Sequence, residues 1–203
     1  MRRFCRISFI FFIVAIFAKT DGGFSNEKIE AQIGPFSLAG PPLTESKLVS
    51  QFGEGFVELE KIGDKLLSKN HVYWIPKQKV WVKVSFSHVL TEKMERVMEG
   101  VLVTKNKLCE QTYIPKVALG PLVTPKGIKI NDSIDKVIEN YGKPTISKII
   151  GKDKIFTVLD EELKLREGII LRYLQKQPTR ELNFAEFYFS QNKLHSLLFS
   201  ESE

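Results

Sequence analysis

The stretch NDSIDKVIENYG, Asn131–Gly142, carries the clearest structural signal in this chain of 203 residues. Its apolar side chains recur at spacings of three and four residues, which places them on one face of a helix. They are Ile134, Val137, Ile138 and Tyr141. Asp132 or Ser133 can accept a hydrogen bond from the free amide groups of the first turn. Gly142 suits the left-handed conformation that ends a helix, and Pro144 prevents its continuation. The pattern therefore predicts a short, capped helix.

A second stretch of the same kind lies upstream. LTESKLVSQFG, Leu43–Gly53, aligns with Asn131–Gly142, and the two terminal glycines are 89 residues apart. Thr44 takes the capping position, and the one-sided apolar stripe is reproduced. The stripe consists of Leu48, Val49 and Phe52. A helix is predicted here as well.

After each helix the period of the apolar residues changes to 2, which is the period of a β-strand. Lys79–Ser87 alternates strictly, so its side chains face two sides of a sheet. Val80, Val82, Val84 and Phe86 face one side, and Trp81, Lys83, Ser85 and Ser87 face the other. Further strands are predicted at Arg96–Thr104, Lys107–Tyr113 and about 155–159, 168–175, 180–190 and 193–200. Connections as short as Asn106-Lys107 force neighbouring strands to be antiparallel.

Comparison of the chain with itself indicates an internal repeat. VLVTKNKLC, Val101–Cys109, matches FYFSQNKLH, Phe187–His195. A further match pairs Val80, Val82 and Val84 with Ile169, Leu171 and Tyr173. We therefore predict two tandem α+β modules, residues 34–115 and 120–203, with a linker at Pro115–Pro125. Each module is expected to pack a short helix on one face of an antiparallel meander and to leave the other face open.

The first 18 residues have the pattern of a secretory signal peptide. Arg2, Arg3 and Arg6 precede the apolar run Ile7–Ala18, which ends in a small residue. The run is shorter than the roughly 20 apolar residues of a membrane-spanning helix. A periplasmic or secreted protein is therefore predicted. An uncleaved amino-terminal anchor stays as the alternative, because Ile16 is bulky for a position near the cleavage site.

Loss of this segment changes the charge of the chain. It removes three of the 30 basic residues and none of the 24 acidic ones, which leaves a net charge of +3. Basic and acidic residues are interleaved along the chain, whereas nucleic-acid binders gather positive charge on one face. We expect no nucleic-acid partner.

The sequence contains little that points to catalysis. His71, His88 and His195 have no carboxylate or cysteine at metal-ligand spacing, and the usual nucleophile and phosphate-binding motifs are absent. The adjacent Glu161–Glu162 are expected in a solvated loop. Cys109, the one cysteine outside the first 18 residues, is expected to be buried. We therefore expect a non-enzymatic protein without catalytic residues, metal or cofactor. A hydrolase or small-ligand protein with its site between the two modules is the alternative of a different class.

The string GIKINDSIDKVIENYGKP, Gly127–Pro144, followed by a meander, resembles the helix-plus-sheet unit of the outer-membrane-assembly lipoprotein family. The tandem arrangement resembles the β-lactamase-inhibitory-protein architecture. The chain lacks the lipidated cysteine that such lipoproteins carry after the signal and the paired cysteines of the inhibitory protein. The resemblance implies a binding or assembly role without identifying a partner.

Aromatic and basic residues on the open sheet faces are the candidate partner-binding residues, since such residues dominate binding energy at interfaces. They are Trp81, Lys83, Arg172, Phe184 and Tyr188. The competing interpretation is that the two modules bury these aromatic residues against each other. The predicted function is binding of another envelope or secreted protein, with membrane contact only through an uncleaved amino terminus. The alternative is a membrane-held assembly or structural factor of the envelope.

Overall fold

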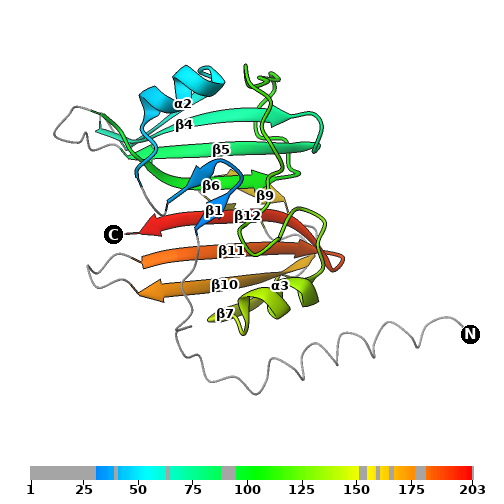
Figure 1. The fold of residues 1–203 in the computed structure, drawn as a ribbon. Helices are drawn as coiled ribbons and strands as arrows, with labels where there is room; N and C mark the ends of the chain where they lie inside the picture. The colour runs from blue at the N-terminus through cyan, green and yellow to red at the C-terminus, as the bar shows by residue number, and fades with distance from the viewer. Residues whose placement is uncertain are drawn as a thin grey trace, which may run out of the picture.

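The structure, a computed structural model, describes residues 31–38, 41–62, 65–87, 95–150, 155–158, 161–164, 167–176 and 182–202. Within these ranges it contains the helices α2 (Glu45–Phe52) and α3 (Ile134–Tyr141) and twelve strands (Figure 1). The strands are β1 (Gln32–Ile33), β2 (Phe36–Ser37), β3 (Phe56–Ile62), β4 (Lys65–Ile75), β5 (Val80–Ser87), β6 (Met98–Thr104), β7 (Ile146–Ile150), β8 (Ile155–Val158), β9 (Glu161–Lys164), β10 (Gly168–Lys176), β11 (Leu182–Ser190) and β12 (Lys193–Ser202). The predicted signal peptide or anchor, residues 1–18, and His88 lie outside the described residues.

Eight of the strands form one sheet, in the order β3-β4-β5-β6-β12-β11-β10-β7. Every neighbouring pair in this sheet is antiparallel. At its centre β6 pairs with β12, with Leu102 opposite Leu198, so strands from both halves of the chain join in one continuous sheet. The α+β class with an antiparallel sheet is confirmed. The pairs β1–β2 and β8–β9 form two small separate sheets.

Both helices begin and end where local capping chemistry predicts. The Thr44 hydroxyl accepts a hydrogen bond from the amide of Lys47, and the Ser133 hydroxyl accepts one from Lys136. Of the two candidate caps of α3, Ser133 is therefore the one used. Gly53 and Gly142 end the helices with φ of 83° and 72°, a region that favours glycine.

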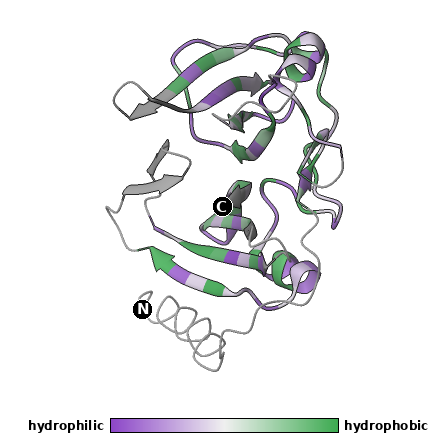
Figure 2. Cartoon of the chain, turned by 90° about the vertical axis from the view of Figure 1, so that its left-hand side faces the viewer, coloured by the Kyte–Doolittle hydropathy of each residue, from purple (hydrophilic) through white to green (hydrophobic). Residues whose placement is uncertain are grey.

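One hydrophobic core lies between the sheet and the two helices. It contains Leu48 of α2 and Ile134, Val137 and Tyr141 of α3, together with side chains from both halves of the sheet. From β5 it takes Val80, Val82, Val84 and Phe86, as the alternation predicts. Figure 2 shows hydrophobic and hydrophilic residues alternating along the strands, with both helices on the same side of the sheet.

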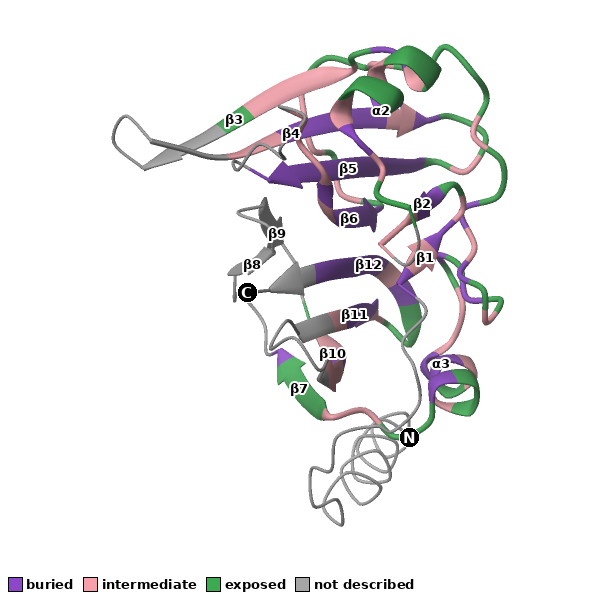
Figure 3. Ribbon diagram, turned by 60° about the vertical axis from the view of Figure 1, so that its left-hand side comes forward, coloured by how far each residue is buried: buried purple, intermediate pink, exposed green. Residues whose placement is uncertain are grey.

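The sheet face turned away from the helices, called the second face below, is buried over its central strands (Figure 3). Trp81 and Lys83 of β5 are only 6% and 3% exposed, where an open face was expected. Side chains of the sheet itself form a second apolar cluster on this face, and Leu108, from the segment after β6, packs against it. The cluster consists of Leu102, Ile150, Ile170, Tyr188 and Leu198. The expectation of a freely open face is therefore wrong for its centre.

Three local predictions are also corrected. The segment Lys107–Tyr113 is not a strand, and its carbonyl at Tyr113 accepts a hydrogen bond from the amide of Trp74 at 2.8 Å. Cys109 in this segment is half-buried rather than buried, and its thiol donates to the carbonyl of Gln111. Glu161–Glu162 begin the strand β9 instead of lying in a loop, because this segment pairs with β8.

Candidate functional site

The structure places the five candidate partner-binding residues on the same sheet face. Trp81 and Lys83 lie on β5, Arg172 on β10, and Phe184 and Tyr188 on β11. Cross-strand registers connect them in rows that run across the second face. One row passes from Trp81 through Thr104 and Ser196 to Tyr188, and another passes from Lys83 through Leu102, Leu198 and Glu186 to Arg172. Sequence analysis placed these residues on the open faces of two separate modules, and the pairing of β6 with β12 joins those faces into one.

Exposure separates these residues into two groups. Trp81, Lys83 and Tyr188 are buried, and Tyr188 has no exposed surface at all. The indole ring of Trp81 packs on that of Trp74 with 5.3 Å between the centroids. Phe184 is half-buried, and the side chain of Arg172 is 39% exposed. Only the last two can touch a partner without rearrangement of the sheet.

A buried carboxylate holds Arg172 in place. The Nε of Arg172 donates to Oε1 of Glu186, whose side chain is 3% exposed. Burial raises the pKa of Glu186, and the charge and hydrogen bond of Arg172 act against that rise. The guanidinium lies over the ring of Phe184, 5.7 Å from its centroid. Arg172 is therefore oriented from behind by an ion pair and from the side by an aromatic ring.

An exposed apolar residue that sequence analysis missed completes this patch. Ile146 on the edge strand β7 lies directly opposite Arg172 in the register and is 45% exposed. Residues opposite each other in a sheet share a face. We call Ile146, Arg172 and Phe184 the margin patch. The signal for Ile146 was the short segment ISKII, Ile146–Ile150, in which polar residues interrupt the isoleucines, so that it is identified as a strand only from its pairing with β10.

A second cluster of functional groups forms around Glu45, the first residue of α2. Its carboxylate contacts Lys69 Nζ at 2.5 Å, His71 Nε2 at 3.1 Å and Arg96 Nη1 at 3.5 Å. The ring of His71 is fully buried, and its Nδ1 lies 2.6 Å from the carbonyl oxygen of Glu54. Sequence analysis did not identify this contact, because Glu45 is 26 residues away from His71 in sequence.

The contacts of His71 attach the sheet to α2 and to the segment that follows it. Both ring nitrogens already face an oxygen acceptor, one from Glu54 and one from Glu45. A histidine engaged in this way has no nitrogen to offer to a metal or a substrate. In the part of the chain that the structure describes, no three histidine, cysteine, aspartate or glutamate residues are grouped to hold a metal ion. The cluster fixes the start of α2 onto β4.

The ion cluster predicts a pH dependence of stability. Burial would raise the pKa of Glu45, but hydrogen bonds and charges of Lys69 and His71 outweigh it and hold the pKa below its ordinary value of 4.5. A carboxylate with a lowered pKa stabilises the fold above pH 4.5, and this stabilisation is lost as the pH falls further. We expect Glu45→Gln to lower the free energy of unfolding by about 1 kcal/mol at pH 7. Urea unfolding from pH 7 to pH 3 measures this effect. The difference in unfolding free energy between the variant and the wild type should become smaller as the pH falls.

The matched control is Glu139→Gln, which makes the same substitution at an exposed position of α3. It should leave the unfolding free energy and its pH dependence unchanged. If the difference in unfolding free energy between Glu45→Gln and the wild type stayed constant over this pH range, the carboxylate charge would not stabilise α2.

Neither α2 nor α3, the helices in the described part of the chain, is long and apolar enough to cross a membrane. Comparison of the sequence and structure with models of protein families, with curated proteins and with solved structures finds no match.

Proposed function

We propose that this chain is an exported, non-enzymatic protein that binds another protein of the cell envelope or the secreted space through the margin patch. The observation that carries the proposal is the pre-oriented guanidinium of Arg172, exposed beside Phe184 and Ile146 at the edge of a large sheet. Arginine and aromatic side chains contribute most to binding energy at protein interfaces. An arginine already held by Glu186 loses less conformational freedom when it binds.

The residues behind the patch give it a firm support. Trp81, Lys83 and Tyr188 are buried on the same face, and Tyr188 lies on β11, the strand that carries Phe184 and pairs with the strand of Arg172. Lys83 approaches Glu58 Oε2 at 3.4 Å, so charged groups as well as aromatic ones contribute to this layer. In this proposal the five predicted residues act together, the exposed ones by contact and the buried ones by positioning.

We also infer that the chain consists of two copies of one module, residues 34–115 and 120–203. Counted outward from the centre of the sheet, β6, β5, β4 and β3 correspond to β12, β11, β10 and β7. A detailed equivalence supports the inference. Tyr73 of β4 donates its hydroxyl to the carbonyl of Gly53, which ends α2, and Tyr173 of β10 donates to Gly142, which ends α3. The resemblance to tandem helix-plus-sheet proteins implies the same organisation.

These correspondences change the alignment of the two copies. Sequence matching pairs the β5 residues Val80–Val84 with Ile169–Tyr173 of β10. In the sheet, β5 is adjacent to the central strand β6, whereas β10 is separated from the central strand β12 by β11. The alignment of the two helices at an offset of 89 residues is retained. For the strands, we align those that occupy equivalent positions in the sheet, in place of those whose apolar residues match in sequence.

Cross-linking in the producing cell tests the binding function. The full chain, with a photo-reactive residue at the exposed position 148, which lies on the same sheet face as Ile146, should form one reproducible adduct with an envelope or secreted protein. Ile146→Ser and Arg172→Ala should each reduce that adduct at least tenfold. Ile146→Ser, which leaves no buried carboxylate unpaired, should do so with a melting temperature changed by only a few degrees. Leu59→Ser is the matched control, since Leu59 is 52% exposed on β3 at the opposite edge. Equal loss of the adduct in the Leu59 and Ile146 variants would contradict the proposal.

A further inference from the structure

A loop of the segment that follows β6 lies beside the turn between β4 and β5. The carbonyl of Tyr113 accepts a hydrogen bond from the backbone amide of Trp74 at 2.8 Å. The carbonyl of Gly120 accepts one from the side-chain amide of Gln78 at 2.9 Å. Residues 114–119 therefore form a loop that begins and ends next to this turn.

Two large apolar side chains of this loop are exposed. Ile114 is 62% exposed and Val117 is 57% exposed. The backbone cannot withdraw them, because Pro115 between them is buried and the amide of Lys116 donates to the carbonyl of Phe52 at 2.9 Å. Exposure of apolar surface to water is unfavourable, so an apolar medium that covers these side chains would be favoured.

Exposed lysines surround these apolar side chains. Lys77 and Lys79 lie in the β4–β5 turn, and Lys116 lies in the loop itself. In the described part of the chain, ion pairs involve other lysines, among them Lys69, Lys83, Lys107 and Lys136. We call this surface the end patch. It consists of Lys77, Lys79, Ile114, Lys116 and Val117.

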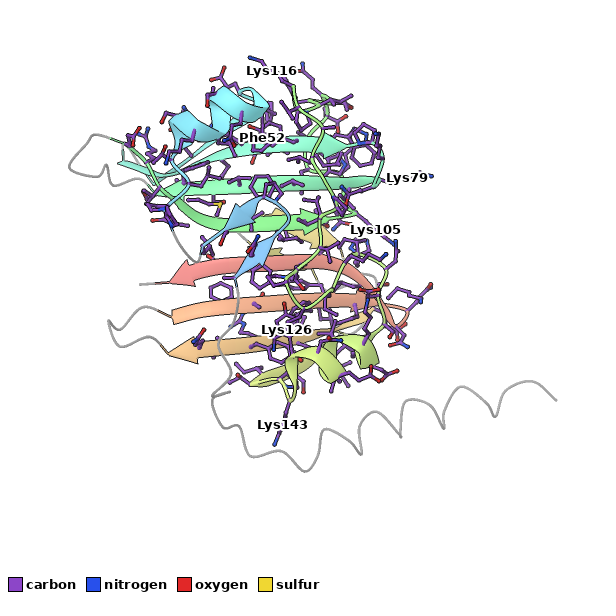
Figure 4. All side chains as sticks on the ribbon, viewed as in Figure 1. Phe52, Lys79, Lys105, Lys116, Lys126 and Lys143 are labelled. Atoms are coloured by element: carbon purple, nitrogen blue, oxygen red, sulfur yellow. The ribbon has the colours of Figure 1, made fainter. Side chains whose placement is uncertain are left out.

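The stretches of chain that form this end of the sheet contain no acidic residue. They are residues 65–87 and 111–131. Lys105, which follows β6, is also exposed, and Figure 4 shows it at the same end of the sheet as Lys79. The positive charge is therefore concentrated at this end.

Acidic side chains near these stretches do little to offset the charge. Glu110 contacts Lys107 at 2.6 Å, and Asp132 contacts Lys136 at 2.9 Å. Glu54, which is exposed and follows α2, offsets at most one of the lysines. The end patch keeps a net positive charge.

The combination of lysine with aliphatic side chains favours a lipid surface over other partners. Protein interfaces are depleted in lysine, and their binding energy comes mainly from tryptophan, tyrosine and arginine, none of which belongs to the end patch. A nucleic acid would use the lysines but would leave Ile114 and Val117 in water. An anionic bilayer uses both kinds of residue, because its surface potential attracts lysines and its interface takes up aliphatic side chains.

We propose that the end patch docks the chain on the surface of an anionic lipid bilayer. Its two aliphatic side chains insert at the level of the head groups, and its three lysines lie beside the lipid phosphates. Sequence analysis predicted membrane contact only through the amino terminus, so this is an additional contact surface. It is separate from the margin patch, which lies on β7, β10 and β11 in the other half of the sheet, and it does not depend on the proposed function.

The first test uses a fluorophore that is sensitive to its environment, attached to a cysteine at position 117 of the full chain. Cys5→Ser and Cys109→Ser remove the other thiols. The probes are vesicles of equimolar phosphatidylcholine and phosphatidylglycerol, and vesicles of phosphatidylcholine alone. The label at position 117 should move into an apolar environment on the anionic vesicles only. The same label at position 59, which is exposed on β3, should stay in water on both.

The second test compares the affinities of variants by titrating the chain labelled at position 117 with anionic vesicles. Lys79→Gln should weaken binding about fivefold, the equivalent of about 1 kcal/mol for one lysine near an anionic surface, and addition of Lys77→Gln should bring the loss to about thirtyfold. Lys47→Gln, which removes the same charge from an exposed position of α2, should leave binding unchanged. Ile114→Ser should weaken binding about fivefold, whereas Ile149→Ser, at a 57% exposed position of β7, should not.

All these chains carry the same amino terminus, so the differences between them belong to the end patch. The proposal is overturned if the label at position 117 responds to neither kind of vesicle or to both alike. An equal response at position 59 would place the membrane contact elsewhere in the chain and would also overturn it. The same holds if Lys47→Gln acts like Lys79→Gln, or if Ile114→Ser keeps full affinity, since lysines alone would then bind any acidic partner, a protein included.

Discussion

Trp81→Ala is expected to lower the free energy of unfolding by about 3–5 kcal/mol, the cost of removing a large aromatic side chain from a core. Trp81 is 6% exposed, and its ring packs on Trp74, the residue opposite it in the register of β4 and β5. The neighbouring strand contributes Thr104, which is buried and bonded through its hydroxyl to Ser196 at 2.6 Å. Alanine would leave a cavity between these groups. Urea unfolding followed by circular dichroism measures the loss.

Phe184→Ala provides the comparison for this prediction. Phe184 lies on the same face but is only half-buried, so its removal should cost about 1–2 kcal/mol. The two substitutions therefore separate the buried centre of the second face from its accessible margin. A Trp81→Ala variant of unchanged stability that had lost its partner would mean that Trp81 is an exposed contact residue, as the open-face prediction held.

The contrast between Trp81 and Val80 shows what strand periodicity can and cannot predict. Alternation correctly places these neighbours on opposite faces, because successive side chains of a strand point to opposite sides. It contains no information on what covers each face. The covering residue Leu108 comes from a segment that was predicted to be a strand of the meander. Burial of the second face is thus a property of the complete fold.

Helix ends were predictable for a different reason. A cap depends on residues within a few positions of one another, and Thr44, Gly53, Ser133 and Gly142 all act as their local sequence predicts. Contacts distant in sequence were not predictable. Thr104 and Ser196, for example, are 92 residues apart and meet only because β6 pairs with β12.

The residues of the candidate site also divide into those that local sequence identifies and those that only the complete fold brings together. Phe184 was identified because β11 alternates, and Arg172 was identified as the counterpart of Lys83 in the sequence alignment of the two copies at an offset of 89. Ile146 was missed because its strand is short and lies at the sheet edge, where only β10 pairs with it. The partner Glu186 could be placed on the face of Phe184 from the sequence, but its contact with Arg172 required the register of the two strands.

Gly55→Ala is expected to be nearly as damaging as the loss of Trp81, although it adds only one methyl group. Gly55 has φ of 70°, a conformation that costs an alanine about 1–2 kcal/mol. A Cβ there would also lie 2.7 Å from Cε1 of Tyr73 and 2.9 Å from the carbonyl oxygen of Val72. Tyr73 cannot move away easily, because its ring is buried and its hydroxyl donates to Gly53 at 2.6 Å. Strain and overpacking together should lower the unfolding free energy by about 3 kcal/mol.

Gly120→Ala separates these causes from a general effect of replacing glycine. A Cβ at Gly120 meets nothing within 4 Å, and Gly120 does not have a positive φ. Its substitution should change the unfolding free energy by less than about 0.5 kcal/mol. Tyr73→Leu in the Gly55→Ala background should recover part of the lost stability, since the smaller side chain leaves room for the new methyl group. Equal stabilities of the two glycine variants would mean that Tyr73 does not pack against the turn after α2. The inferred duplication would then lose the support of one of its two equivalent tyrosine contacts.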